Sequence, residues 1–167
     1  MSEAKKLTSP PTWEPTVRAN LCFVVNAGRI LLIRKKRGFG AGKINGPGGK
    51  VDPGETPMES AIRETFEELC VTPIGVRQAG ELFFEFLDGM RLHCVVFAAD
   101  DVNGEARETD EAVPLWTDLD AIPYDEMWAD DRFWLPHLIR GEQFRGTFLF
   151  DGEKLLDRRI DVIPPVD

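Results

Sequence analysis

The residues best suited to chemistry in this chain are glutamates that recur at helical spacing after a glycine-rich loop. Gly49 ends that loop, and the charged residues that follow include Glu55, Arg63, Glu64, Glu67 and Glu68. Side chains three and four positions apart on a helix are neighbours, so the last three carboxylates repel one another unless a cation neutralises them. Oxygen ligands of this kind suit Mg²⁺ or Mn²⁺ better than zinc or copper. The segment therefore predicts a site for a hard divalent cation, and such cations commonly bind phosphates.

The alternative is an acidic helix face that is simply solvated. A solvated face normally interleaves lysines with its glutamates, whereas positions 57–69 contain no lysine and a single arginine, Arg63. Solvation also leaves unexplained the run Gly46-Pro47-Gly48-Gly49 just upstream, where glycines let the backbone approach a bound group closely. The loop and the acidic helix together favour the metal site.

The helix that carries these carboxylates has a clear start. Thr56 is a good N-cap, Pro57 suits the first helical position, and Glu59 completes a capping box with Thr56. Arg63 then lies on a flank from which it can turn back toward Glu55 in the preceding loop. The positions predicted to form the buried stripe of the helix are Met58, Ala61, Ile62, Thr65, Phe66 and Leu69.

The segment resembles the Nudix box, G-x5-E-x7-R-E-U-x-E-E-x-G-U, where U is a bulky apolar residue, and every charged position matches. Two positions depart. Thr65 replaces an aliphatic residue, and Cys70 replaces the glycine that normally ends the helix in a left-handed conformation, so we expect a strained or redrawn chain exit. The resemblance implies an α/β fold, a Nudix α/β/α sandwich with a mixed β-sheet between helices.

The reaction implied by this resemblance is metal-assisted hydrolysis of a nucleoside triphosphate to a monophosphate and pyrophosphate. Mg²⁺ is the implied cofactor, with Mn²⁺ as an alternative, and a bound metal lowers the pKa of a water molecule. The implied metal ligands are Gly49 (through its carbonyl), Glu64, Glu67, Glu68 and Glu111. The implied catalytic residues are Glu55, Arg63, Glu67, Glu68 and Glu111. Glu67, Glu68 and Glu111 remain alternatives as the proton acceptor, and Arg63 paired with Glu55 would hold loop and helix in register.

Beyond the box, from about Ala19 onward, the chain is similar to the Nudix subgroup that hydrolyses oxidised purine nucleoside triphosphates. The stretches that carry this likeness are Lys35–Lys43 with Asn45-Gly46, Phe84-Glu85-Phe86, Asp110-Glu111 and Met127–Asp131. The residues implied to bind the substrate are Asn20, Lys35, Phe39, Asn45, Phe84, Trp128, Asp130 and Asp131. Ile44 and Pro47 stand where animal members carry aromatic residues, which leaves the pocket shape open.

Each of these residues has an implied role. The residues matching Asn45, Asp130 and Asp131 bind the purine edge in the subgroup, and those matching Phe84 and Trp128 contact its face. The residue matching Phe39 closes the pocket, the one matching Lys35 lies near the phosphates, and the one matching Asn20 lines the pocket.

Two adjacent carboxyl groups such as Asp130 and Asp131, when buried together, cannot easily both ionise. One would keep its proton and donate a hydrogen bond, whereas the other would accept one, which suits both 8-oxoguanine and 2-hydroxyadenine. The alternative is that the pair caps the following helix, although a cap needs only one of them. For Phe84 and Trp128 the alternative is ordinary core packing.

Composition limits the remaining possibilities. The 167 residues suffice for one domain with its own core, which we place at residues 16–163 after a mobile extension at 1–15. The net charge of −9 argues against a nucleic-acid polymer or an anionic membrane as partner. Three scattered cysteines, Cys22, Cys70 and Cys94, indicate reduced thiols and a cytoplasmic protein. We therefore expect a monomer whose partner is a small-molecule nucleotide.

Strands and one more helix are expected around the acidic helix. Apolar runs at 18–25 and 29–34 predict a hairpin, as do 144–150 and 154–162, and further strands are expected at 80–87, 91–99 and 115–117. A second helix is expected at about 131–140, with Pro136 near its early turns or kinking it.

Two other functions stay open on the sequence. A Nudix hydrolase of another compound, such as a dinucleoside polyphosphate, a nucleotide sugar or a methylated purine triphosphate, would fit the box equally well. A binding or regulatory module without catalysis is the second, but the intact Arg63 and its neighbouring glutamates argue against it.

Overall fold

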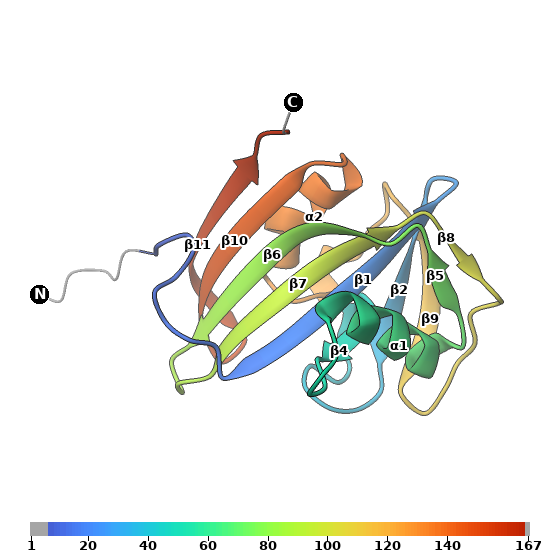
Figure 1. The fold of residues 1–167 in the computed structure, drawn as a ribbon, viewed down its shortest axis with the longest axis horizontal. Coiled ribbons are helices and arrows are strands. Elements are labelled where there is room, and N and C mark those ends of the chain that lie inside the picture. The colour runs from blue at the N-terminus through green and yellow to red at the C-terminus, as the bar shows by residue number, and fades with distance from the viewer. Residues whose placement is uncertain (1–6, 166–167) are drawn as a thin grey trace, which may run out of the picture.

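The structure, a computed structural model, describes residues 7–165 and is built on one mixed sheet (Figure 1). The strands follow the order β11-β10-β6-β7-β1-β2-β3, while β4 pairs with β1 and β9 pairs with β2. The pairs β1–β7 and β6–β10 are parallel and the other pairs are antiparallel, so the predicted mixed sheet is confirmed. The strands of this sheet are β1 (Val17–Asn26), β2 (Arg29–Lys35), β3 (Ile44–Asn45), β4 (Gly48–Lys50), β6 (Arg77–Phe86), β7 (Arg91–Ala99), β9 (Ala112–Asp118), β10 (Gln143–Asp151) and β11 (Lys154–Ile163).

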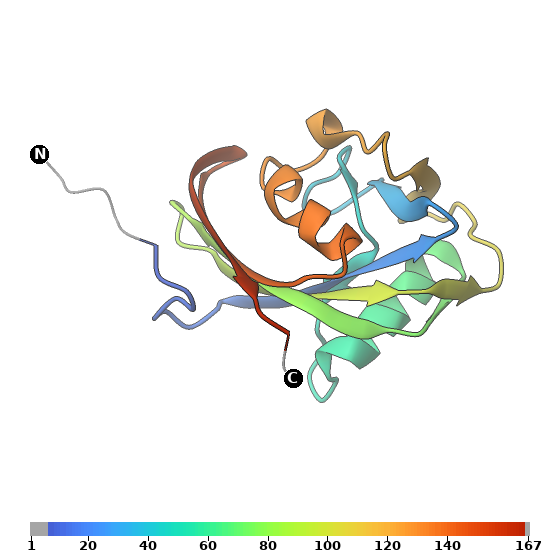
Figure 2. The same cartoon turned by 90° about the horizontal axis from the view of Figure 1, so that it is seen from above.

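Two helices cover opposite faces of the sheet. Helix α1 (Pro57–Leu69) lies on one face and α2 (Asp131–Ile139) on the other, after the short 3-10 helix η1 (Tyr124–Glu126) (Figure 2). The sheet therefore separates two apolar clusters, which is the predicted α/β/α arrangement. The cluster on the α2 side includes Leu82, Phe84, Val96, Trp134, Phe144 and Phe148. The cluster on the α1 side includes Cys22, Leu31, Ala61, Leu69, Val95 and Phe97.

The start of α1 follows the prediction. The Thr56 hydroxyl accepts a hydrogen bond from the Glu59 backbone N–H at 3.1 Å, and the Glu59 carboxylate accepts from the Thr56 N–H at 3.0 Å. This capping box satisfies two of the N–H groups that a helix start leaves unpaired. At the other end Cys70 adopts the left-handed conformation, with φ 64° and ψ 26°, although it has a side chain. The usual helix exit is thus kept without glycine, at some cost in backbone strain.

The predicted buried stripe of α1 was partly wrong. Met58 and Phe66 are 38% and 56% exposed, whereas Ser60 and Glu68 are buried together with Ala61, Thr65 and Leu69. The helix is turned about its axis relative to the apolar pattern, and this turn carries the Glu68 carboxyl inward beside the glycine-rich strand β4. Burying a carboxylate is unfavourable without a partner, so the rotation of α1 indicates a functional demand that overrides hydrophobic patterning.

The predicted strands and the second helix are all present, with ends that differ by a few residues. The hairpin between β1 and β2 turns through Ala27 and Gly28, both at positive φ. Pro136 lies inside α2. The prediction missed β3 and β4, as well as β5 (Thr72–Ile74) and β8 (Asp101–Asn103), which form a separate two-stranded sheet.

Of the extension predicted at 1–15, residues 1–6 lie outside the described part of the chain. From residue 7 onward the segment contacts the sheet: Leu7 is buried, the Thr147 hydroxyl donates to the Thr8 carbonyl at 3.2 Å, and Trp13 packs edge-on against Phe83. A search of residues 7–165 for a helix long and apolar enough to cross a membrane finds none.

Candidate active site

One cavity of about 710 Å³ brings most of the predicted site together. Among its lining residues are Asn20, Lys35, Phe39, Asn45, Gly49, Glu64, Glu68, Phe84, Glu111, Trp128, Asp130 and Asp131. The predicted site residues that do not line it are Glu55, Arg63 and Glu67. Carboxylates from α1 and Glu111 thus share one space with the aromatic and acidic residues from β6 and the start of α2.

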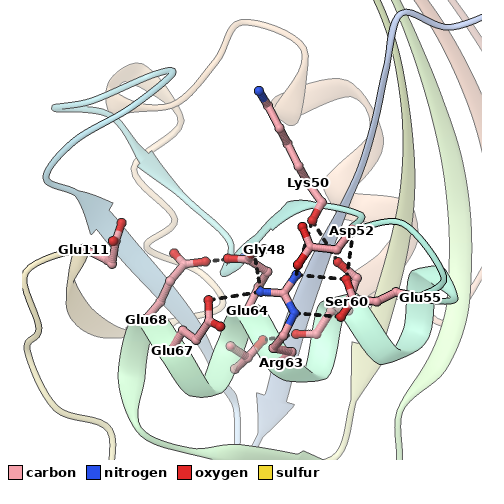
Figure 3. Close-up of polar contacts among 12 residues, drawn as sticks. Gly48, Lys50, Asp52, Glu55, Ser60, Arg63, Glu64, Glu67, Glu68 and Glu111 are labelled. Atoms are coloured by element: carbon pink, nitrogen blue, oxygen red, sulfur yellow. Dashed lines mark hydrogen bonds and ion pairs between the residues drawn. The ribbon is translucent and has the colours of Figure 1, made fainter.

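Arg63 joins the loop before α1 to the carboxylates on α1 (Figure 3). Its Nε and Nη2 donate to the two carboxylate oxygens of Glu55 at 2.7 and 2.9 Å. Its Nη1 donates to Glu64 and to Glu67, each at 3.1 Å. The bond from Arg63 lowers the pKa of Glu55 to about 2, with help from the Asp52 backbone N–H. The predicted Arg63–Glu55 contact is therefore present, and it fixes the loop against the helix.

Glu64, Glu67 and Glu68 form an acidic row on α1, and Glu68 is its buried member. Its side chain is buried, with 5% of its surface exposed, and one carboxylate oxygen accepts a hydrogen bond from the Gly48 N–H at 3.0 Å. Burial raises the pKa of Glu68 to about 8, although the Gly48 bond opposes the rise. Within residues 7–165 no basic side chain forms an ion pair with Glu68. A buried carboxylate without a cation is the group that gains most from binding one.

Glu64, unlike Glu68, has a basic partner, and its carboxylate lies against the backbone of Gly49. A Cβ on Gly49 would lie 2.6 Å from the Glu64 carboxyl carbon, so only glycine leaves room for this carboxylate against the backbone. Burial raises the pKa of Glu64, and the Arg63 bond works against that rise. Within residues 7–165 no three acidic, histidine or cysteine side chains converge at metal-binding distance, and Arg63 binds both Glu64 and Glu67. The all-oxygen donor set nevertheless fits Mg²⁺ or Mn²⁺.

Glu111 approaches the cavity from the loop before β9. Arg37 binds one Glu111 carboxylate oxygen through Nε at 3.0 Å and also through Nη2, and this hydrogen bonding lowers the pKa of Glu111. The Lys36 N–H donates to the Glu111 carbonyl at 2.9 Å. Glu111 is therefore ionised near neutral pH, in contrast to Glu68 in the metal-free protein.

Asp130 and Asp131 lie at the other end of the cavity and are 2% and 3% exposed. Burial raises the pKa of both, and the Asp130 charge raises that of Asp131 further. The Trp134 indole N–H donates to Asp130 Oδ2 at 2.7 Å, which favours the ionised form of Asp130. The pair therefore resists losing both protons, and the shared proton is favoured on Asp131. Asp130 occupies the N-cap of α2 but makes no side-chain cap bond, so the capping alternative does not explain the pair.

The aromatic residues at this end belong both to the core and to the cavity. Phe84 is 9% exposed and stacks on Phe148, with ring centroids 5.3 Å apart. Trp128 stacks on Phe39 at 5.1 Å with an interplanar angle of 19°, while its edge meets Phe150. The core-packing alternative is thus correct for part of each ring, and the remaining surface of Phe84 and Trp128 lines the cavity.

The sequence did not reveal several residues that shape the site. Arg37 binds Glu111, Trp134 binds Asp130, and Ser60 accepts a bond from the buried Asn20 amide at 2.7 Å. Phe86 also lines the cavity. The alternation of β6 could have identified Phe86, because residues two apart on a strand share a face with Phe84. Trp134 lies four residues after Asp130, a spacing at which side chains meet on a helix, so that contact also had a local signal. The Arg37–Glu111 and Asn20–Ser60 contacts join segments distant in sequence and leave no local signal.

Known proteins resemble this chain in both sequence and fold. Residues 15–138 match the NUDIX domain family. The chain is 44% identical to the oxidized purine nucleoside triphosphate hydrolase of Danio rerio, over 86% of the chain and 93% of that protein. It is 42% identical to the Mus musculus protein of the same name, over 80% and 86%. The crystal structure of a MutT protein from Bacillus halodurans superposes with a TM-score of 0.78 at 28% identity, covering 87% of this chain and 97% of that one. The chain belongs to the Nudix hydrolase family.

Proposed function

We propose that this protein hydrolyses oxidised purine nucleoside triphosphates of the 8-oxo-dGTP and 2-hydroxy-dATP type to a monophosphate and pyrophosphate, with Mg²⁺. Such a reaction removes damaged nucleotides from the precursor pool. The observation that carries the proposal is the single cavity, in which carboxylates suited to a metal and a buried pair of aspartates share one space. The names of the vertebrate relatives, whose sequences align over most of the chain, support the same substrate class.

The phosphate end of the cavity would hold the cation between α1 and the loops around it. The proposed ligands are the Gly49 carbonyl, Glu64, Glu67, Glu68 and Glu111. When bound, the cation supplies positive charge to the phosphate oxygens and lowers the pKa of a water molecule. Lys35 lines the same end and would contact the phosphates as a point charge.

The chain itself supplies the proton acceptor. Glu111 is one candidate, because Arg37 keeps its carboxyl ionised, although the lowered pKa also makes it a weaker base. Glu68 is the second candidate and would need a bound cation to be ionised near pH 7. Glu67 is the third candidate. Arg63 and Glu55 hold the α1 carboxylates in place and do not line the cavity themselves.

The base end offers hydrogen bonds of both polarities. Asp131 carries a proton that it can donate, and Asp130 accepts; one oxygen of Asp131 has no partner in the described residues. Asn45 uses its oxygen to accept from the Gly46 N–H at 2.8 Å, which leaves its amide NH₂ to donate. Phe84 and Trp128 would contact the purine face.

The test is a panel of nucleotides with the purified protein, Mg²⁺ and detection of pyrophosphate. The panel would contain 8-oxo-dGTP, 2-hydroxy-dATP, dGTP, a methylated purine triphosphate, a dinucleoside polyphosphate and a nucleotide sugar. We expect the highest kcat/KM for the two oxidised triphosphates. Preference for any other compound would overturn the substrate, and absence of turnover for all of them would overturn catalysis. Hydrolysis in ¹⁸O-labelled water would then identify the phosphorus that is attacked.

A further inference from the structure

The last turn of α1 is held by a loop that lies far away in the sequence. The final carbonyls of a helix have no partner within it. Here the Arg107 N–H donates to the Leu69 carbonyl at 2.9 Å, and the Thr109 hydroxyl donates to the Glu68 carbonyl at 2.7 Å. The loop between β8 and β9 thus completes the C-terminal end of the helix that carries the acidic row.

The Thr109 hydroxyl is used twice. While it donates to the Glu68 carbonyl, it accepts a hydrogen bond from the Glu111 N–H at 3.1 Å. One oxygen atom therefore joins the backbones of two residues that line the same cavity from different elements.

The remaining contacts of Glu111 tie it to the opposite side of the cavity. The Lys36 N–H binds its carbonyl, and Arg37 binds its carboxylate, so both contacts come from the loop that directly follows β2. The Thr109 hydroxyl, by contrast, links the Glu111 backbone to the end of α1 through two hydrogen bonds. Without these bonds, the Arg107–Leu69 bond would still join the loop to α1, but it lies further from Glu111 along the chain, so the distance between Glu111 and Glu68 would be less tightly fixed.

We propose that Thr109 is a positioning residue that fixes Glu111 relative to Glu68 for the metal-dependent step. This inference rests on the proposed function, in which both glutamates serve the same cation. Thr109 is half-buried and its hydroxyl faces two backbone groups, so a valine fills the same volume but supplies neither bond. Groups that orient metal ligands typically change metal affinity or activity by about 10- to 100-fold when they are lost.

The test uses the wild type, Thr109→Val, Thr109→Ser, Glu111→Gln and the double variant Thr109→Val with Glu111→Gln. The matched control is Thr117→Val, because the Thr117 hydroxyl donates to the Leu115 carbonyl at 3.1 Å on β9 and does not line the cavity. The measurements are the Mn²⁺ dissociation constant of the substrate-free protein, by electron paramagnetic resonance, and kcat and KM for 8-oxo-dGTP.

For Thr109→Val we expect Mn²⁺ affinity and kcat to fall about 10-fold or more, with KM within about 2-fold of wild type. Thr109→Ser restores both bonds and should stay within about 2-fold, as should the Thr117→Val control. Because Thr109 acts through Glu111, adding Thr109→Val to Glu111→Gln should cause no further loss.

Additive losses in the double variant, or a serine variant as weak as valine, would overturn the role of Thr109. If Thr109→Val does not fold, Thr109→Ala provides the same comparison with a smaller side chain. A wild type that binds Mn²⁺ but hydrolyses no oxidised purine triphosphate would refute the proposed substrate, and the Mn²⁺ measurements would still decide the role of Thr109. A wild type that binds no Mn²⁺ would overturn both.

Discussion

Replacing Glu68 with glutamine should raise the stability of the metal-free protein while it removes activity. The carboxyl is buried without a cationic partner, and its pKa rises from 4.5 in the unfolded chain to about 8 in the fold. Folding at pH 7 therefore requires Glu68 to take up a proton. At 1.36 kcal/mol per pH unit above 4.5, this uptake costs about 3 kcal/mol at pH 7. Glutamine carries no charge and can still accept the Gly48 hydrogen bond.

The sign of the pH dependence follows from the direction of this shift. A carboxyl whose folded pKa is raised favours the fold below the unfolded pKa, and that contribution is lost as pH rises from 4.5 through about 8. The free energy of unfolding of Glu68→Gln should thus equal that of wild type near pH 4.5 and exceed it by about 1–3 kcal/mol at pH 7, since local relaxation reduces the full cost. The melting temperature should rise by about 2–4 °C per kcal/mol.

The assay is urea unfolding in EDTA between pH 5 and 8, together with turnover of 8-oxo-dGTP at saturating Mg²⁺. Turnover of Glu68→Gln should fall at least about 100-fold, because a proposed metal ligand is lost. Glu105→Gln, on an exposed part of the loop before β9, is the matched control and should change neither quantity. A stability difference that does not grow with pH would refute the unpartnered state of Glu68. Near-normal turnover would refute its place at the metal.

Three further changes test other parts of the site. Asp130→Asn should lower the preference for 8-oxo-dGTP over dGTP about 10-fold, measured as the ratio of kcat/KM values, because it replaces one acceptor oxygen of the buried pair with an NH₂ donor; an unchanged ratio would exclude Asp130 from base recognition. Gly49→Ala should weaken Mn²⁺ binding about 10-fold, since its Cβ would displace the Glu64 carboxylate that lies 2.6 Å away, and calorimetry showing wild-type affinity would contradict this. Cys70→Gly should stabilise the protein by about 0.5–1 kcal/mol in urea unfolding with unchanged activity, because it removes the strain of a left-handed residue at φ 64°; lower stability would show that Cys70 bears no such strain.

The charged positions of the site could be predicted because the metal chemistry imposes a fixed spacing on one helix. Arg63 and Glu55 were expected to meet, and they do so at 2.7 Å. The capping box at Thr56 could be predicted for the same reason, because its two residues lie three positions apart. These features depend on residues close in sequence, so helical geometry alone relates them.

The rotation of α1 about its axis could not be predicted from the residues of the helix. Hydrophobic pattern placed Met58 and Phe66 inside, but the structure buries Glu68 and exposes both apolar side chains. Burial of the Glu68 carboxyl does not stabilise the ligand-free protein and is explained only by a bound ligand. The hydrophobic pattern carries no information about such a ligand. The short strands β3 and β4 were missed for a simpler reason, since two or three residues carry no periodicity.

The sheet also has an evolutionary consequence, because the residues proposed to bind the two ends of the substrate pack on separate cores. Phe84 and Trp128 pack with the cluster under α2, whereas Ala61 and Leu69 anchor the acidic helix in the cluster on the opposite face. Substitutions that reshape one cluster need not disturb the other. Relatives of this chain could therefore diversify in the nucleobase they accept while inheriting the hydrolytic machinery unchanged.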